Sequence, residues 1–370
     1  MANHQFLLTL LLAAGLSQTA AYSQTDSDSI MLDAPKIISF ALDGNIPKAL
    51  ETVNATSDEK MIRRHLKVRN GFNERFSGTT DRSDYLAKRH SAIDSLLIIY
   101  RDYWRKSFLD YPKVHDTMLR ENLSAFLSRN YKPAKKLKGS DSNEKFDKHL
   151  VNYIKSKGLH TTGFGQTGRF YDLLVWKKET DTVYKFTLHG QMIHTPVVFM
   201  EDFVTLGWEE YATMDRAFPG GWAKPTALYC VKKSYDLNSE SFLISYLAHE
   251  GRHFEDYKLF PKLSTTDLEY RAKLTELSLL EKTLFDTLSF FISNADYKTE
   301  DGHKRADYYV VSALSKKLFD SEFESDISRW KTLKPETIHT ASAALFSENT
   351  AALQKKGKKV VTNFTPGTKS

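Results

Sequence analysis

The pentapeptide His249-Glu250-Gly251-Arg252-His253 carries the residue types and the spacing of a metal-dependent hydrolytic site. Residues four apart share one face of a helix, so the imidazoles of His249 and His253 can bind one ion from a rigid edge. Glu250 stands beside the first histidine, where its carboxylate can accept the proton of an attacking water. Catalytic zinc takes imidazole and carboxylate ligands and keeps one position open for water. The motif therefore predicts a zinc site with His249 and His253 as ligands and Glu250 as general base.

A third protein ligand is expected from the helix predicted to follow the motif. Glu269 lies 16 residues after His253, enough for a loop and a return of the chain. Ala272, one turn further on, leaves room for the second helix to approach the first. Two alternatives stay open: Glu276, on the same helix face two turns later, is a rival ligand, and Glu269 could instead act with Thr266 in a capping box. We expect Glu269 to be the third ligand.

With these residues the chain resembles the zincin metallopeptidases, and in particular the gluzincins, in which a glutamate from a second helix completes the His-Glu-x-x-His site. The resemblance covers Leu247–Glu276. It implies a zincin-like active-site helix and hydrolysis of peptide bonds. It also implies that His249, His253 and Glu269 are the zinc ligands. Glu250 would then be the general base and acid.

The resemblance implies further parts of an active site. Gluzincins place an extended edge strand above the cleft, where a peptide can add as another strand; Ala227–Val231 is the candidate for this strand. An oxyanion needs a hydrogen-bond donor, for which His303, Tyr308 and Tyr309 are candidates. Asp256, one turn past the second histidine, is a candidate to hold an imidazole by hydrogen bonding.

Two other functions fit parts of the same pattern. Di-iron helical proteins use Glu-x-x-His twice, and such pairs end at His253, His303 and His339. The β-rich stretch 169–236 would interrupt a four-helix bundle, and His249 would have no role in that site. A non-catalytic exported binding protein with a zincin-like fold would keep every residue of the motif, so that only an assay separates it from an enzyme.

Helical periodicity dominates the chain on both sides of a β-rich middle. In residues 33–160 apolar positions recur near every 3.6 residues, and from 237 to about 354 the pattern returns. Asn238 or Ser239 can cap the helix that carries the motif. The predicted helices are Asp84–Leu109, His115–Tyr131 and Phe146–Lys157, followed by 239–258, 266–292, 303–320 and 336–353.

Residues 161–236 are rich in aromatic and β-branched side chains and predict a small sheet. We expect a hairpin in which strands Arg169–Lys177 and Thr182–Leu188 flank a polar Glu-Thr-Asp turn. Gly220–Trp222 predicts the turn before the last strand, Ala227–Tyr235. The predicted elements are helices, then a compact sheet, then helices again. This order predicts an α+β fold that is mostly helical, with a small mid-chain antiparallel or mixed sheet.

The N-terminal residues 1–23 have the pattern of a secretory signal. Phe6–Leu16 is an apolar run too short to span a bilayer, and Ala21 and Ser23 suit a cleavage site. The remaining 24–370 lacks a convincing linker and predicts one zincin-like domain. We therefore expect an exported protein with no integral membrane segment after the signal is removed.

Composition narrows the compartment and the partners. The single cysteine, Cys230, excludes an intramolecular disulfide and a cysteine-rich zinc site, which favours a bacterial periplasm or exterior for an exported chain. A net charge of +6 over 370 residues is far below that of a dedicated nucleic-acid binder. We expect a peptide or protein substrate and no nucleic acid, and leave the oligomeric state open. Lys355–Lys359 and the tail after it predict a frayed, solvated end.

Overall fold

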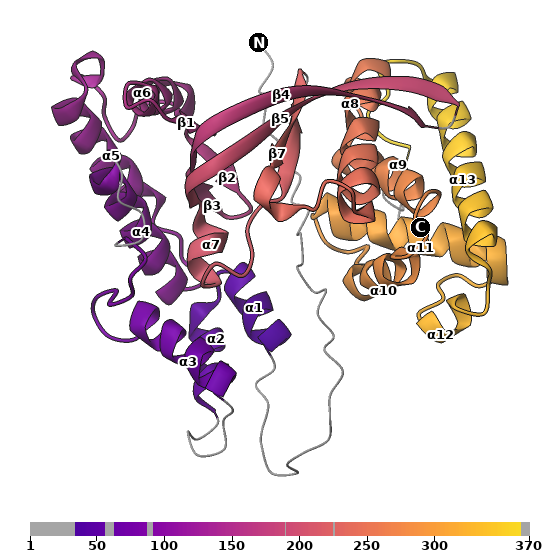
Figure 1. Ribbon diagram of the computed structural model, residues 1–370, viewed down its shortest axis with the longest axis horizontal. Helices are drawn as coiled ribbons and strands as arrows, with labels where there is room; N and C mark the ends of the chain where they lie inside the picture. The colour runs from indigo at the N-terminus through magenta and orange to yellow at the C-terminus, as the bar shows by residue number, and fades with distance from the viewer. Residues whose placement is uncertain (1–33, 56–62, 87–91, 189, 225, 364–370) are drawn as a thin grey trace, which may run out of the picture. The chain divides into compact units, whose positions relative to one another are not determined.

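The computed structural model describes residues 34–55, 63–86, 92–188, 190–224 and 226–363 (Figure 1). The signal segment predicted at 1–23 lies outside these residues. The chain forms two compact units: one comprises the residues up to Glu179 with Met200–Gly220, and the other comprises Thr180–Phe199 with the residues from Gly221 onward. The segment 24–370, which the sequence predicts as one domain, thus contributes to both units.

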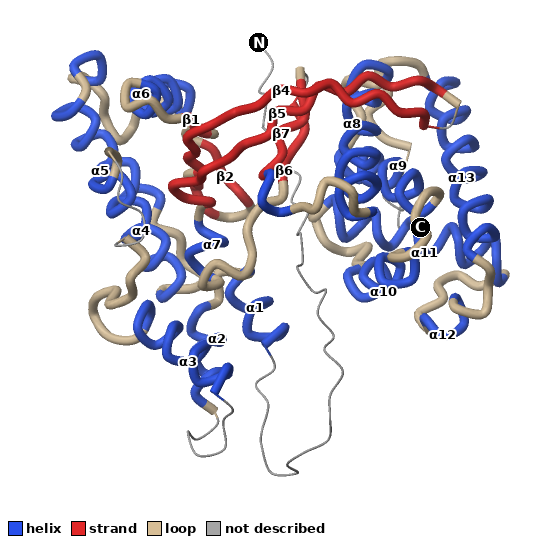
Figure 2. The backbone as a smooth tube through the Cα atoms, in the orientation of Figure 1, coloured by secondary structure: helices blue, strands red, loops and turns tan. Residues whose placement is uncertain are grey.

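The strands of the structure are β1 (His160–Thr161), β2 (Gly165–Thr167), β3 (Phe170–Asp172), β4 (Leu174–Leu188), β5 (Gln191–Leu206), β6 (Gly221–Lys224) and β7 (Ala227–Val231). They form a five-stranded sheet in the order β1-β4-β5-β7-β6 and a two-stranded sheet of β2 and β3. Helices make up 55% of the structure and strands 15%, which confirms the α+β class with mostly helical content (Figure 2). None of the helices that the structure describes is both long enough and apolar enough to cross a membrane.

Helices of the first unit are α1 (Ala34–Leu42), α2 (Ile46–Asn54), α3 (Arg63–Phe76), α4 (Asp94–Leu109), α5 (Asp116–Asn130), α6 (Asn143–Lys155) and α7 (Trp208–Ala212). The predicted helices at 115–131 and 146–157 are confirmed as α5 and α6. The predicted start at Asp84 is wrong, because α4 begins ten residues later. An aromatic core holds this unit together, in which Trp104 and Phe108 of α4 pack against Tyr211 of α7.

The predicted polar turn after Lys177 is wrong, because the chain continues through it as the single strand β4. Side chains from Lys177 to Val183 are exposed, so polar residues here occupy the solvent-facing part of a strand and do not bend it. The turn comes later, at Gly190, whose φ of 79° is readily adopted only by glycine. Only two residues separate β4 from β5, which makes these neighbouring strands an antiparallel hairpin.

The turn predicted at Gly220–Trp222 is also wrong, since Gly221 begins strand β6. This strand pairs antiparallel with β7, with Gly221 opposite Cys230. A Cβ on Gly221 would lie 2.4 Å from the carbonyl oxygen of Tyr229, so the glycine serves close strand approach. Because β7 lies between β5 and β6, Ala227–Val231 is not an edge strand, and that expectation is corrected.

Helices of the second unit are the π-helix η5 (Ser241–Ala248), α8 (His249–Leu259), α9 (Thr265–Leu277), α10 (Leu284–Asn294), α11 (Gly302–Phe319), α12 (Ile327–Trp330) and α13 (Pro335–Lys356). One continuous helical segment, η5 followed by α8, confirms the prediction at 239–258. The single helix predicted at 266–292 is wrong, because the chain leaves the helix after Leu277. Glu240 holds this break: its carboxylate accepts the backbone N–H groups of Lys282 and Thr283 at 3.0 Å.

Helix α9 packs against α8, α11 and α13 and lies among them in Figure 1. Every residue from Thr266 to Leu277 is buried. A helix buried on all sides must satisfy its charged side chains within the protein. The four charged residues of α9 beyond its first turn therefore need internal partners, and the partners they find define the candidate site.

The lysines of Lys355–Lys359 are exposed, as predicted, but the residues from Val361 to Asn363 are ordered against the start of α9, so the predicted fraying is wrong for these three residues. The backbone N–H of Ser264 donates to the carbonyl of Val361 at 2.6 Å. The carboxylate of Asp267 accepts the hydroxyl of Thr362 and the backbone N–H of Asn363. These contacts hold the loop that leads from α8 into α9.

Candidate metal centre

The two motif histidines lie one turn apart on α8, in the middle of the helical segment. Ser239 caps the start of that segment, because its hydroxyl oxygen accepts the backbone N–H of Phe242 at 3.2 Å. Gly251, between the histidines, lies against the ring of Phe186 from β4: a Cβ there would be 2.8 Å from Phe186 Cζ. The glycine thus lets the sheet cover the helix directly beside the site.

His249, His253 and Glu269 converge in the structure. Their donor atoms lie within 4.8 Å of one another, and each side chain is at most 3% exposed. His253 Nε2 is 3.0 Å from Glu269 Oε1, and His249 Nε2 is 3.4 Å from Glu269 Oε2. Ligands about 2.0–2.1 Å from a tetrahedral ion are separated by about 3.3–3.4 Å. The donor set and its spacing can therefore hold a metal ion.

Glu269 does not cap its helix, which removes the alternative role left open by the sequence. Ser264 is the N-cap of α9, and its hydroxyl oxygen accepts the backbone N–H of Asp267 at 3.2 Å. The same hydroxyl donates to Asp267 Oδ2 at 2.5 Å. Capping is complete without Glu269, whose side chain faces the two histidines.

Glu276, the rival third ligand, contacts the other nitrogen of His249. Its Oε2 lies 3.3 Å from His249 Nδ1, and the residue is 4% exposed. An Nδ1–H donated to Glu276 leaves the lone pair of Nε2 directed toward Glu269. This arrangement suits Glu276 to orient the imidazole while Glu269 completes the donor set.

Glu250 is fully buried, and neither of its carboxylate oxygens has a hydrogen-bond partner. Burial raises the pKa of this carboxyl, although the nearby imidazoles of His253 and His249 oppose the shift. Buried side-chain oxygens are normally hydrogen-bonded. Two unpartnered buried oxygens next to three convergent donors are the pattern expected of a site that binds a further species.

The pKa values of the donor groups respond to their close packing. Burial alone would lower the pKa of His249, but contacts with Glu269 and Glu276 raise it to about 10. Burial would raise the pKa of Glu269, yet His303 and His253 together hold it well below its usual range. Without an ion, a proton on His249 is thus stabilised between two carboxylates.

His303, a candidate oxyanion donor from the sequence, lies at the site, where its contact is with Glu269. Its Nδ1 lies 3.1 Å from Glu269 Oε2, and its side chain is 27% exposed whereas Glu269 is 2% exposed. The two tyrosines proposed with it lie elsewhere: Tyr308 stacks on Phe323, and Tyr309 packs against the helical core of the second unit.

A buried ion pair next to this contact was missed from the sequence. Lys273 Nζ is 2.8 Å from Asp307 Oδ1, and both side chains are at most 6% exposed. Lys273 follows Glu269 by four residues, and Asp307 follows His303 by four. Two matching i, i+4 pairs on separate helices were the available signal, but the sequence does not say that these helices are neighbours.

The expectation that Asp256 holds an imidazole is wrong. Its carboxylate binds Arg271 through two hydrogen bonds of 2.7 and 3.0 Å and contacts Arg252 at 3.0 Å. All three residues are at most 1% exposed. Because two guanidinium groups satisfy Asp256, the acid joins α8 to α9 and does not reach the histidines.

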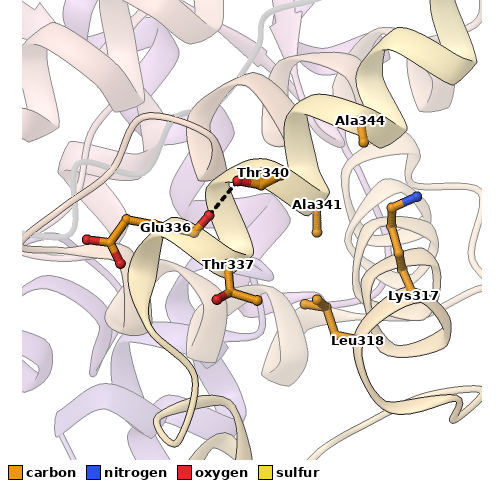
Figure 3. A pocket seen from close by; sticks show the side chains of 7 residues that line it. All are labelled: Lys317, Leu318, Glu336, Thr337, Thr340, Ala341 and Ala344. Carbon is orange, nitrogen blue, oxygen red and sulfur yellow. Dashed lines mark hydrogen bonds between the residues drawn. The ribbon is translucent and has the colours of Figure 1, made fainter.

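His253 and His303 both contact Glu269, but the Glu-x-x-His pairs of the di-iron alternative do not come together as pairs, because Glu300 is exposed and His339 has another partner. His339 Nε2 lies 2.7 Å from the carbonyl oxygen of Leu280. Glu336 lines a shallow groove between α11 and α13, where Thr340 donates its hydroxyl to the Glu336 carbonyl (Figure 3). Within the described part of the chain, the one cluster with metal-binding geometry is His249, His253 and Glu269.

The assignment of a metal centre rests on this geometry and on the sequence motif. Comparison of the chain with protein-family models, with curated proteins and with solved structures gives no match.

Proposed function

We propose that this protein is an exported zinc-dependent metallopeptidase. The observation that carries the proposal is Glu250, a fully buried carboxylate with two unpartnered oxygens adjacent in sequence to His249. Leaving a buried polar group unsatisfied costs about 1–3 kcal/mol, and more for a charged group. A general base that must accept a proton from a bound water accounts for this cost.

The charges around the site favour a divalent cation. Three buried carboxylates, those of Glu250, Glu269 and Glu276, lie next to the two motif imidazoles, and without an ion they are offset only in part, by the proton on His249. Uncompensated buried charge is strongly unfavourable, and a bound divalent ion would offset most of it. Two imidazoles and one carboxylate suit zinc better than calcium or magnesium, which prefer oxygen ligands alone.

The proposed chemistry divides between the ion and the chain. Zinc in such a site polarises a carbonyl oxygen and lowers the pKa of a water to about 7. His249, His253 and Glu269 would hold the ion, and Glu276 would keep the His249 imidazole in the required tautomer. Glu250 would accept the proton of the attacking water and return it to the leaving amine. The raised pKa of its carboxyl brings this acid closer to the neutral range in which a general base and acid works.

The sequence supports both a peptide substrate and an exported location. The resemblance of Leu247–Glu276 to gluzincins points to a peptide or protein substrate, and the pattern of residues 1–23 points to the periplasm or the exterior. A non-catalytic exported binding protein is the alternative that the test below distinguishes.

The test compares Glu250→Gln with the wild type and with Glu255→Gln, a control on the same helix whose carboxylate pairs with Lys258 at 2.7 Å. Each protein is loaded with zinc, its zinc content is measured, and cleavage of an unfolded protein substrate and of a fluorogenic peptide library is followed. We expect one zinc in all three and cleavage at least about 100-fold slower in Glu250→Gln alone. A zinc-loaded wild type that cleaves no faster than Glu250→Gln would be a binding protein instead.

A further inference from the structure

Helices α9 and α11 are joined beside the metal centre by two consecutive polar contacts. The first connects Glu269 Oε2 with His303 Nδ1 at 3.1 Å, and the second, one turn along both helices, connects Lys273 Nζ with Asp307 Oδ1 at 2.8 Å. Asp307 is held in turn by the side-chain amide of Asn294 at 2.6 Å. These contacts fix the position of α11 along α9, so that His303 lies beside the proposed ligand Glu269.

We propose that His303 is a positioning residue of the metal centre, which holds Glu269 Oε2 so that Oε1 remains available to the ion beside His253. The two oxygens of Glu269 already differ in their partners: Oε1 lies 3.0 Å from His253 Nε2, whereas Oε2 lies nearer to His303 Nδ1, at 3.1 Å, than to His249 Nε2, at 3.4 Å. A carboxylate ligand whose second oxygen accepts a hydrogen bond is fixed in orientation, which raises metal affinity. The proposal rests on the proposed metal centre and is independent of whether the protein cleaves peptides.

The backbone around His303 holds the imidazole in place. Asp301 caps α11, and its carboxylate accepts the backbone N–H of His303 at 2.8 Å. Gly302 lies directly on the first turn of α9, because a Cβ there would be 2.7 Å from Thr265 Cγ2 and 3.2 Å from the Thr266 nitrogen. The first turn of α11 is thus fastened to the first turn of α9, and His303 is carried to Glu269 by this contact.

Partial exposure makes His303 suitable for substitution. Its side chain is 27% exposed, so truncation removes the contact with Glu269 without opening a fully enclosed cavity. Asparagine can place its amide N–H near the position of the imidazole Nδ1, and alanine cannot. His194, exposed on strand β5, provides a control histidine away from the donor set.

The experiment measures zinc affinity by competition with a chromophoric chelator, and the visible absorption spectrum of the Co²⁺-substituted protein, for the wild type, His303→Ala, His303→Asn and His194→Ala. Thermal unfolding of each metal-free protein verifies folding. We expect His303→Ala to bind zinc about 10–100-fold more weakly and to change the Co²⁺ spectrum, because Glu269 is released. His303→Asn should recover most of the affinity, and His194→Ala should match the wild type.

Zinc affinity and a Co²⁺ spectrum in His303→Ala equal to those of the wild type would overturn the proposal. So would an equal loss of affinity in the alanine and asparagine variants with an unchanged spectrum, because that pattern reports packing only. A wild type that binds no zinc would overturn both this inference and the proposed function. Zinc binding that depends on His303, without peptide cleavage, would overturn the proposed activity alone.

Discussion

His249 turns its Nδ1 toward Glu276, with 3.3 Å between Nδ1 and Oε2. Both residues are buried, and the opposite nitrogen of the same ring lies 3.4 Å from Glu269. When the proton is on Nδ1, Glu276 accepts its hydrogen bond and Glu269 lies where the lone pair of Nε2 points. Glu269 and Glu276 can reach the two nitrogens of one ring because they lie two turns apart on the same face of α9.

Replacing Glu276 with leucine should weaken zinc binding about 10–100-fold, because the His249 tautomer is no longer held. Glu276→Gln should lose less, since its amide oxygen can still accept the Nδ1–H. Chelator competition measures both effects, with Glu281→Gln as a control five residues further along the chain. Zinc affinities of Glu276→Leu and the control that agree within twofold would contradict this role.

Zinc should also stabilise the fold. A ligand that binds only the native state adds about 2.7 kcal/mol to the free energy of unfolding at a free concentration of 100 times Kd. We expect the melting temperature of chelator-treated protein to rise when zinc is restored, and the rise to vanish in His253→Ala. His194→Ala should keep the full response. An identical zinc response in His253→Ala would mean that the ion binds elsewhere.

Local spacing made part of the site predictable. The i, i+4 pair His249 and His253 needs only a helix, and Glu269 needs only a second helix returning after a short loop. Choosing between Glu269 and Glu276 required the structure, because both lie on one face of α9 and the choice depends on which nitrogen of His249 each reaches. His303 was not assignable to Glu269, since no local pattern tells that α11 packs on α9.

Long-range pairing explains the errors in the fold. The strand Ala227–Val231 looks the same from its sequence whether it lies at an edge or inside the sheet, and only its pairing with β6 decides. The polar residues after Lys177 match a turn as well as an exposed strand, and the neighbouring strand β5 makes the difference. Asp256 was expected to hold an imidazole because its partner in the structure, Arg271, lies on another helix.

Removing the charge of Asp256 should destabilise the second unit strongly. Asp256 and Arg271 are both 0% exposed and joined by two hydrogen bonds, so Asp256→Asn leaves buried guanidinium groups without a counter-charge. Breaking a buried pair in this way costs about 3–5 kcal/mol. Urea unfolding measures the change, with the exposed Lys316–Asp320 pair as reference: Asp320→Asn should cost less than about 1 kcal/mol. Equal losses in the two variants would contradict the structural role of Asp256.

Asp172, in the first unit, gives a prediction that does not involve the metal centre. It is 3% exposed and lies against the start of α7, where its Oδ1 accepts the backbone N–H of Trp208 at 2.9 Å and that of Leu173 at 2.8 Å. Burial raises the pKa of this carboxyl to about 6, although the two N–H donors oppose the shift.

An acid whose pKa is higher in the folded state than in the unfolded state binds its proton more tightly when folded, so its contribution to stability falls as pH rises. For Asp172 the fall begins near the unfolded pKa of 3.8, is complete above about 6, and amounts to about 3 kcal/mol. Asp172→Asn keeps an oxygen for both N–H groups but cannot ionise. The free energy of unfolding of this variant relative to the wild type should therefore rise by about that amount between pH 3.5 and pH 7. A difference between the two proteins that does not vary with pH over this window would show that Asp172 ionises in the folded state with its ordinary pKa.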